Sequence, residues 1–406
     1  MLETFPVGVD ALVIVLLLVA RMPWLGESLG WSVAPALAAM AFLYVGVDVL
    51  ERGRGSDGRR LKLALLVAMI GLYVVAPSVQ LIILRHASKP WAYVHDNVIQ
   101  TEEAMKFLLR GQNPYAASYV DTPLYRWDPQ NPALYHYLNL PFQLLVALPV
   151  YWLDLRVAYL AMFASMLPLM FRLGKDATSG LLLMAVFALN PLFTRGQVEG
   201  RNDIVVMWTL AMALWLADRG RARASAVFVG LMCASKHTAW LFVPFYLQSF
   251  FEGGGSWRAA LRKTWPAWAT AAALMLPFIL WSPIAFYRSV LGYPMGTVEH
   301  GYPIRGEGAY GFATWVLAWH WVPNDQARFP FILFQAGFGI PVMLLCLRWQ
   351  RRENTRRVMF AGYAITLFCF QFFTRYFNQN HLAFIIFILA LGTLVSERAR
   401  VTMTAA

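Results

Sequence analysis

The sequence predicts an all-α protein that crosses a membrane many times, and two features of its composition carry this prediction. Of the 406 residues, 59% are hydrophobic and 14% are charged, whereas soluble domains have about 45–50% apolar and about 25% charged residues. The apolar residues also gather in separate runs, as they do in membrane-spanning helices. A chain of this composition needs lipid as part of its solvent.

The apolar runs predict a bundle of about 11 to 13 transmembrane helices, although a spanning helix needs about 20 residues and several runs are shorter. Short segments are expected to pack inside the bundle or to line a polar cavity. The runs lie at residues 7–20, 31–49, 61–84, 132–152, 157–171, 180–193, 204–217, 226–234, 238–251, 267–280, 329–347, 358–373 and 382–395.

Short basic runs set the expected orientation of the chain. The positive-inside rule places such runs, where they border apolar segments, in the cytoplasm. They also explain the net charge of +12 without a basic face, so no nucleic-acid partner is expected. The basic runs lie at residues 52–62, 219–223, 258–263, 348–357 and 398–400.

This orientation puts two long loops outside a plasma membrane, where the polar and aromatic residues concentrate. The whole chain, residues 1–406, is expected to form one integral membrane domain. Its parts are N-terminal helices at 1–85, a first outer loop at 86–131, a helix bundle at 132–281, a second outer loop at 282–328, and C-terminal helices at 329–406.

The number of crossings between Asn131 and Arg219 stays open. Four apolar runs lie between them, but the charges require an odd number of crossings. Either residues 132–152 enter the membrane and return, or Arg172 and Lys175 face outward. A helical hairpin at residues 226–251 is expected to carry Lys236 at its tip, toward the outer side.

The first outer loop contains the most informative stretch of sequence. An interfacial helix is expected at residues 98–110, with apolar positions on one side and acids and bases on the other, and Gly111 ends it. Asp96 precedes this helix. A carboxylate at the mouth of a membrane cavity is a candidate general base, although an Asp in this place also serves as a helix N-cap.

Three sequence motifs stand out between roughly residues 60 and 250. They are Leu-Leu-x-Gly-x-Asn-Pro-Tyr at 108–115, Asn190-Pro191 followed by Gly196-Gln197 and Asn202-Asp203, and Gly230-Leu231 followed by Ser235-Lys236. In this order the motifs resemble GT-C class glycosyltransferases, closest to the polyprenyl-phosphate-sugar-dependent mannosyltransferases that include phosphatidylinositol mannoside enzymes.

The resemblance implies that Asp96 is the catalytic base. The donor is then a polyprenyl phosphate sugar, with mannose as the sugar, and the acceptor is a lipid-linked molecule or a glycan. Transfer occurs with inversion on the extracytoplasmic side. The resemblance also implies that Lys236 holds the lipid phosphate, and an intramembrane lysine is costly unless it is functional.

Other residues are expected to bind substrate, each with a plainer alternative. Arg195, Arg201 and Arg375 are further phosphate ligands, unless they snorkel to lipid headgroups. Asp203 orients substrate or Lys236, or caps its helix. Further candidates, which otherwise serve as helix-face, bundle or interface residues, are His95, Gln197, Glu102, His237 and His300.

Two other functions remain as alternatives. A transporter or lipid flippase would show pseudo-symmetric halves, which the sequence lacks, and a polysaccharide polymerase or ligase would use a diphosphate-linked donor. The sequence contains no DxD, Walker or HExxH motif, so no metal or cofactor is expected. The expected partners are the sugar donor, the acceptor and membrane lipids.

Overall fold

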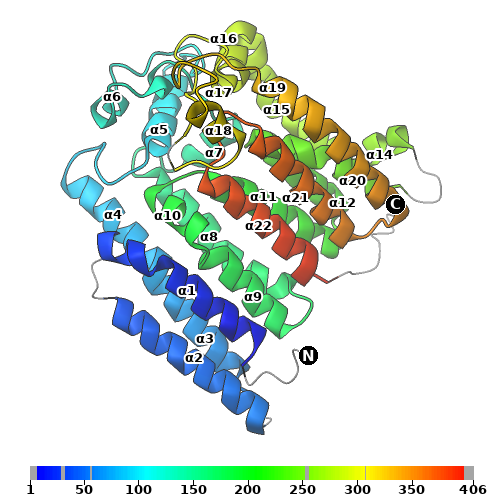
Figure 1. The fold of residues 1–406 in the computed structure, drawn as a ribbon. Coiled ribbons are helices and arrows are strands. Elements are labelled where there is room, and N and C mark those ends of the chain that lie inside the picture. The colour runs from blue at the N-terminus through cyan, green and yellow to red at the C-terminus, as the bar shows by residue number, and fades with distance from the viewer. Residues whose placement is uncertain (1–6, 29–32, 55–56, 252–255, 307, 397–406) are drawn as a thin grey trace.

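The computed structural model describes residues 7–28, 33–54, 57–251, 256–306 and 308–396. In these ranges the chain is helical, and its only β-structure is two isolated bridges. Figure 1 shows long helices lying side by side, with the short helices and loops gathered at one end. The predicted all-α, polytopic membrane architecture is therefore confirmed. The basic run at 398–400 lies outside the described residues.

Within the described residues, four uninterrupted helical segments are long and apolar enough to cross a membrane. They are Ala34–Gly53 in α2 (Ala34–Arg54), Arg59–Ala87 (α3, Arg59–Ile70, to α4, Ala76–Ala87), α8 (Leu155–Leu173), and Phe331–Arg352 (α19, Phe331–Phe334, to α20, Ile340–Arg352). Two bent pairs raise the number to six: α9 (Ala177–Ala188) with α10 (Pro191–Glu199), at 54°, and α14 (Trp257–Lys263) with α15 (Trp265–Trp281), at 68°.

The rest of the bundle consists of shorter apolar helices, as the short runs in the sequence predicted. They are α1 (Val9–Ser28), α11 (Asp203–Asp218), α12 (Ala222–Cys233), α21 (Arg356–Phe372) and α22 (Gln379–Leu394). The pairs α11–α12, α12–α15, α20–α21 and α21–α22 pack closely. Large apolar side chains remain exposed on the outer helices, such as Leu280 on α15 and Leu345 on α20, as expected for a surface that faces lipid.

The structure shows how the chain runs between Asn131 and Arg219. Residues 132–152 form no spanning helix; they contain η3 (Pro132–Leu134) and α7 (Phe142–Ala147) and stay at the loop-rich end, where the Phe142 amide donates to Ala234 O at 3.0 Å. Helix α8 then leads away, α9 and α10 return, and α11 leads away again. The chain therefore passes three times between the two ends of the bundle, the odd number that the charges require.

Contacts at the opposite end of the bundle agree with this path. Arg356 pairs with Asp218, Gly174 forms a β-bridge with Val395, and Arg356 Nη1 donates to Ser396 O at 3.2 Å. The turn after α8 and the end of α11 therefore lie at the same end as the basic run that starts α21. We call this the arginine end, and the opposite end, which carries residues 88–154 and 282–330, the loop end.

The predicted helix of the first outer loop is α5 (Asp96–Leu109), and Gly111, with φ +74°, follows its end. Glu102, on the predicted polar side of this helix, is only 5% exposed. Arg85 donates to both carboxylate oxygens of Glu102, at 3.1 and 2.7 Å, and to Asp154 at 2.9 Å. Glu102 is buried because these partners satisfy its charge.

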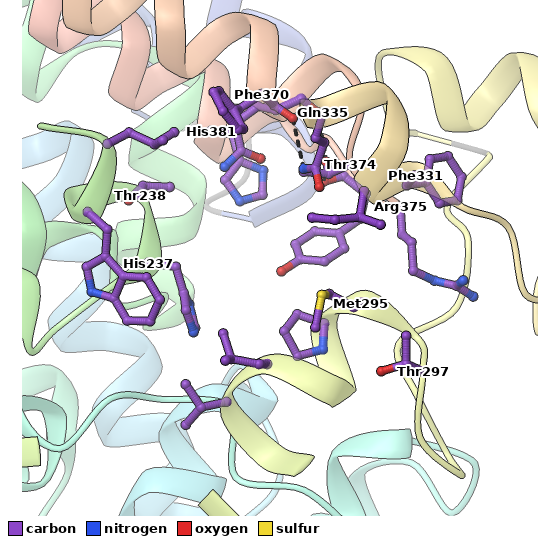
Figure 2. Close-up of a pocket in the computed structure, with 18 of the residues that line it drawn as sticks. His237, Thr238, Met295, Thr297, Phe331, Gln335, Phe370, Thr374, Arg375 and His381 are labelled. Carbon is purple, nitrogen blue, oxygen red and sulfur yellow. Dashed lines mark hydrogen bonds between the residues drawn. The ribbon is translucent and has the colours of Figure 1, made fainter. Parts of the chain in front are cut away.

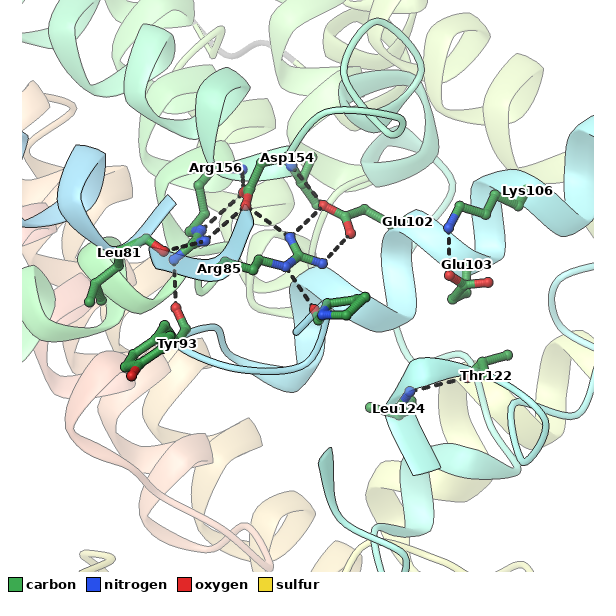
Figure 3. A network of polar contacts seen from close by, with 12 residues as sticks. Leu81, Arg85, Tyr93, Glu102, Glu103, Lys106, Thr122, Leu124, Asp154 and Arg156 are labelled. Carbon is green, nitrogen blue, oxygen red and sulfur yellow. Dashed lines mark hydrogen bonds and ion pairs between the residues drawn. The ribbon is translucent and has the colours of Figure 1, made fainter. Parts of the chain in front are cut away.

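This buried network fixes α5 to the bundle (Figure 3). Asp154 caps α8 and also pairs with Arg156 at 2.8 Å, while Arg156 Nη1 donates to Tyr93 O at 2.7 Å. The network therefore joins the end of α4, the start of α8 and the segment that leads into α5. Its consequence is a rigid base beneath the residues at the start of α5.

The two long loops dock on each other at the loop end. Ser289 Oγ donates to Tyr115 O at 3.1 Å, which joins the second loop to the first. Beyond the predicted end of the first loop, His136 Nε2 lies 2.8 Å from Glu299 O, and Tyr135 stacks on His300 with ring centroids 3.9 Å apart. The second loop therefore covers the first.

Candidate active site

Asp96 lies in the first turn of α5, where two side chains hold its carboxylate. His95 Nδ1 lies 2.6 Å from Oδ1, and Asn131 Nδ2 donates to Oδ2 at 2.9 Å. The Asp96 side chain is 23% exposed. His95 is the N-cap of α5, so Asp96 also sits at the positive end of the helix dipole.

The surroundings of Asp96 favour its charged form. Burial raises the pKa of Asp96, but the charge and hydrogen bond of His95, together with bonds from Asn131 and the Asn97 amide, outweigh burial and hold the pKa below its usual range. Asp96 is therefore a carboxylate at neutral pH and available to accept a proton.

A wall of three tyrosines lies beside a cavity. The Tyr302 ring lies 5.7 Å from the Tyr293 ring and 4.5 Å from the Tyr376 ring, measured between centroids. The Asp96 charge contributes to raising the pKa of Tyr293, after the larger effect of burial. Tyr376 also lines the cavity.

The cavity has a volume of about 400 Å³ and is mainly apolar. Figure 2 shows its side chains around an open centre. Ile332 on α19 lines the cavity and is 55% exposed. The lining residues are Lys236, His237, Thr238, Trp240, Leu241, Val290, Leu291, Pro294, Met295, Thr297, Phe329, Pro330, Phe331, Ile332, Gln335, Phe370, Gln371, Thr374, Arg375, Tyr376 and His381.

Lys236 occupies the tip of the hairpin formed by α12, η4 (His237–Phe242) and α13 (Val243–Gln248), as the sequence predicted. It forms an ion pair with Asp203 at the start of α11. Asn380 Nδ2 also contacts both Asp203 carboxylate oxygens, at 3.2 and 3.1 Å. The ammonium group is therefore held at the cavity edge, and its charge is balanced.

Three asparagines connect the two halves of the site. Asn202 Nδ2 donates to Asn139 Oδ1 at 2.7 Å, and Asn139 Nδ2 donates to Asn97 Oδ1 at 2.9 Å. Asn202 directly precedes Asp203, and Asn97 directly follows Asp96. The chain of amides thus fixes the start of α11 relative to the start of α5.

The other predicted arginines lie in three different settings. Arg375 is 3% exposed; its stem lines the cavity while its guanidinium points away from the centre (Figure 2) and binds the backbone oxygens of Tyr302, Asp325 and Ala327. Arg195 is largely exposed and pairs with Glu199 at 2.8 Å. The buried Nε of Arg201 has no hydrogen-bond partner among the described residues.

The remaining predicted residues divide between the cavity and supporting positions. His237 lines the cavity, and its Nε2 is buried without a partner in the described part of the chain. Gln197 is 2% exposed and donates to Tyr159 O at 3.4 Å on α8. His300 is stacked at the loop interface, and Glu102 belongs to the network beneath α5.

Sequence reasoning missed Arg305, Asn131, Asn139 and Asn380. Arg305 lies in the second loop, where its guanidinium is 5.6 Å from the centroid of the Tyr302 ring. A basic residue in a predicted outer loop runs against the positive-inside pattern. This is the one feature of the sequence that could have pointed to Arg305. The asparagines carry no comparable signal, because their role depends on partners that are distant in the sequence.

Among the described residues, no group of three or more His, Cys, Asp or Glu side chains is arranged to hold a metal ion. No curated protein matches the chain. Residues 130–374 match glycosyltransferase family 87, more than half of the chain.

The matched region begins after Asp96 and includes Lys236, Asp203, Arg305 and nearly all of the cavity lining. It continues well beyond residue 250, where the resemblance seen in the sequence motifs stopped. The chain therefore belongs to glycosyltransferase family 87.

Proposed function

We propose that this glycosyltransferase moves a sugar, mannose, from a polyprenyl phosphate onto a lipid-linked or glycan acceptor outside the plasma membrane. One observation carries the proposal: the site combines an ionised Asp96, a wall of tyrosines and a half-buried lysine, Lys236, at the edge of an apolar cavity. The mannosyl specificity follows the resemblance of the first loop and of the segments around Gln197 and Lys236 to mannosyltransferases.

The cavity suits the lipid part of such a donor. Ligand pockets are mainly apolar with a few placed polar groups, and this cavity has Lys236 and His237 at one edge. Because Ile332 both lines the cavity and is exposed where α19 faces lipid, an isoprenoid chain can enter from the bilayer. The phosphate then lies near Lys236, with the sugar toward Asp96.

Direct displacement is the reaction that this arrangement supports. The acceptor hydroxyl attacks the anomeric carbon while Asp96 takes the hydroxyl proton. The bond from the anomeric carbon to the phosphate oxygen breaks, and its electron pair leaves with the lipid phosphate. A single displacement inverts the anomeric configuration. Fixed cations in a partly dry site stabilise the departing phosphate.

The orientation rests on charge. The basic residues of α14, α20 and α21 belong to the end opposite the loops, and the positive-inside rule places that end in the cytoplasm. Asp96 and the cavity then face the extracytoplasmic side, where polyprenyl phosphate sugars serve as donors because nucleotide sugars are absent.

Transfer assays with the purified protein in liposomes test this proposal. We expect turnover with polyprenyl-phosphate mannose and none with the Asp96→Ala variant. Turnover only with a diphosphate-linked oligosaccharide would show a polymerase or ligase instead. Movement of labelled lipid across the bilayer with no transfer product would show a flippase.

A further inference from the structure

Arg305 is placed between the two halves of the site. Its guanidinium lies over the Tyr302 ring, 5.6 Å from the centroid, and its side chain is exposed. Its backbone amide donates to Arg375 O at 2.9 Å, which anchors it to the turn between α21 and α22. Tyr302 in turn packs on Tyr376, a cavity residue. The Arg305 guanidinium therefore lies against the tyrosine wall, over the ring of Tyr302.

The charges of Arg305 and Asp96 interact with each other. Tyr302 and, after the opposing effect of burial, Asp96 raise the pKa of Arg305 above its usual value. In the part of the chain that the structure describes, no carboxylate forms an ion pair with Arg305. Arg305 thus stays positively charged, and the guanidinium donors that Tyr302 does not use remain available.

The other cations of the site are already engaged. Asp203 balances the charge of Lys236, so this pair contributes no net charge. The guanidinium of Arg375 donates to three backbone oxygens of the second loop and is buried. Neither group can offset an additional negative charge as well as an unpaired, exposed arginine can.

The proposed reaction creates such a charge. The donor phosphate is a diester with a charge of −1, whereas the product is a monoester, which carries about −1.5 to −2 at pH 7. A second cation is needed as the bond breaks. Arginine suits this task, because its planar fork donates two parallel hydrogen bonds to phosphate oxygens.

We propose that Arg305 binds the phosphate of the donor and stabilises the charge that leaves with it. Arg305 stays protonated throughout; the acceptor proton goes to Asp96, and the electron pair of the broken bond stays on the phosphate oxygen. This inference rests on the proposed polyprenyl phosphate donor. It adds a phosphate ligand from the second loop to Lys236 on the hairpin.

Binding and kinetics of matched variants test the inference. A hydrogen bond to a charged group contributes about 1.5–3 kcal/mol, so Arg305→Ala should weaken binding of polyprenyl phosphate about 10- to 150-fold. The donor KM should rise, with the acceptor KM nearly constant. Arg305→Lys should fall between the two. The control, Arg328→Ala, removes an exposed charge from the same loop and should match wild type.

The outcomes separate this inference from the proposed function. If wild type transfers sugar from polyprenyl phosphate but Arg305→Ala binds polyprenyl phosphate normally, Arg305 is not the ligand and the function stands. If wild type transfers sugar yet does not bind polyprenyl phosphate, the donor class and this inference are both wrong. A lower melting temperature with unchanged donor affinity would make Arg305 a scaffold of the loop and also overturn the inference.

Discussion

The Nδ1 atom of His95 lies 2.6 Å from the Oδ1 atom of Asp96, so the proposed base is in direct contact with its neighbour. Burial raises the pKa of Asp96, and His95 is the main influence that lowers it. Because the net shift is downward, Asp96 stays ionised well below the usual aspartate pKa of about 3.9. The pH dependence of transfer should reveal this contact.

His95→Asn should shift the acid side of the pH profile upward. Asparagine can still accept the hydrogen bond from the Asn97 amide that caps α5, but it carries no charge to lower the pKa of Asp96. In wild type, kcat/KM should fall only at pH values below about 3.9. Measurement of kcat/KM from acidic to neutral pH checks this, and identical profiles would show that His95 does not tune Asp96.

Asp96→Asn should reduce transfer about 10²- to 10⁴-fold, the usual contribution of a general base. The variant keeps the shape of the side chain and the contact with Asn131, so its melting temperature should stay close to wild type. Asp121→Asn, an exposed change in the same loop, is the control and should keep full activity. Equal activity of the two variants would remove Asp96 as the base.

Breaking the Lys236–Asp203 pair should cost both stability and activity. Lys236→Met leaves the Asp203 carboxylate, 3% exposed, without its cation, and loss of a buried partner costs about 3–5 kcal/mol. Adding Asp203→Asn should restore much of the stability but not transfer, because the cavity still lacks its ammonium group. Chemical denaturation and transfer assays separate the two effects.

An exposed ion pair serves as the control for this cycle. Arg195→Ala breaks the pair with Glu199, whose arginine is 48% exposed, and should cost about 0–1 kcal/mol. If it reduces transfer as strongly as Lys236→Met does, Arg195 belongs to the binding site after all.

Two neighbouring glutamates on α5 should behave differently. Glu102→Ala leaves Arg85 without one of its two carboxylate partners in a buried network, so we expect a loss of about 3–5 kcal/mol. Glu103→Ala breaks a pair with Lys106 that is 38% exposed on the lysine side, and should cost about 0–1 kcal/mol. Melting temperatures compare the two; a raised donor KM in Glu102→Ala without loss of stability would instead favour its role in binding.

The sequence was sufficient to predict the fold class and the position of Lys236. Hydropathy sees every apolar run, and the turn at Ser235 and Lys236 between two short runs predicted the hairpin tip. Hydropathy could not tell that residues 132–152 are apolar because they pack at the loop end. The distinction depends on their neighbours, such as Ala234, which are far away in the chain.

The candidate site was only partly predictable for the same reason. Asp96 stands out because it follows an apolar segment and precedes a helix. Glu102 looks like a solvated helix residue until Arg85 at the end of α4 and the Leu155 amide at the start of α8 donate hydrogen bonds to it. Arg305 and Asn139 gain their roles only when the second loop folds over the first and α11 approaches α5.

Arg375 has a mechanical consequence for substrate exchange. The Arg375 guanidinium donates to the carbonyl oxygens of both Tyr302 and Ala327 and so holds together the two ends of the loop between them. Because Arg375 lies in the turn between α21 and α22, this loop cannot move away from the protein unless the turn moves with it or these hydrogen bonds break. The proposed lipid donor can therefore enter and leave more easily from the bilayer past Ile332 than through the second loop, which can stay in place during substrate exchange.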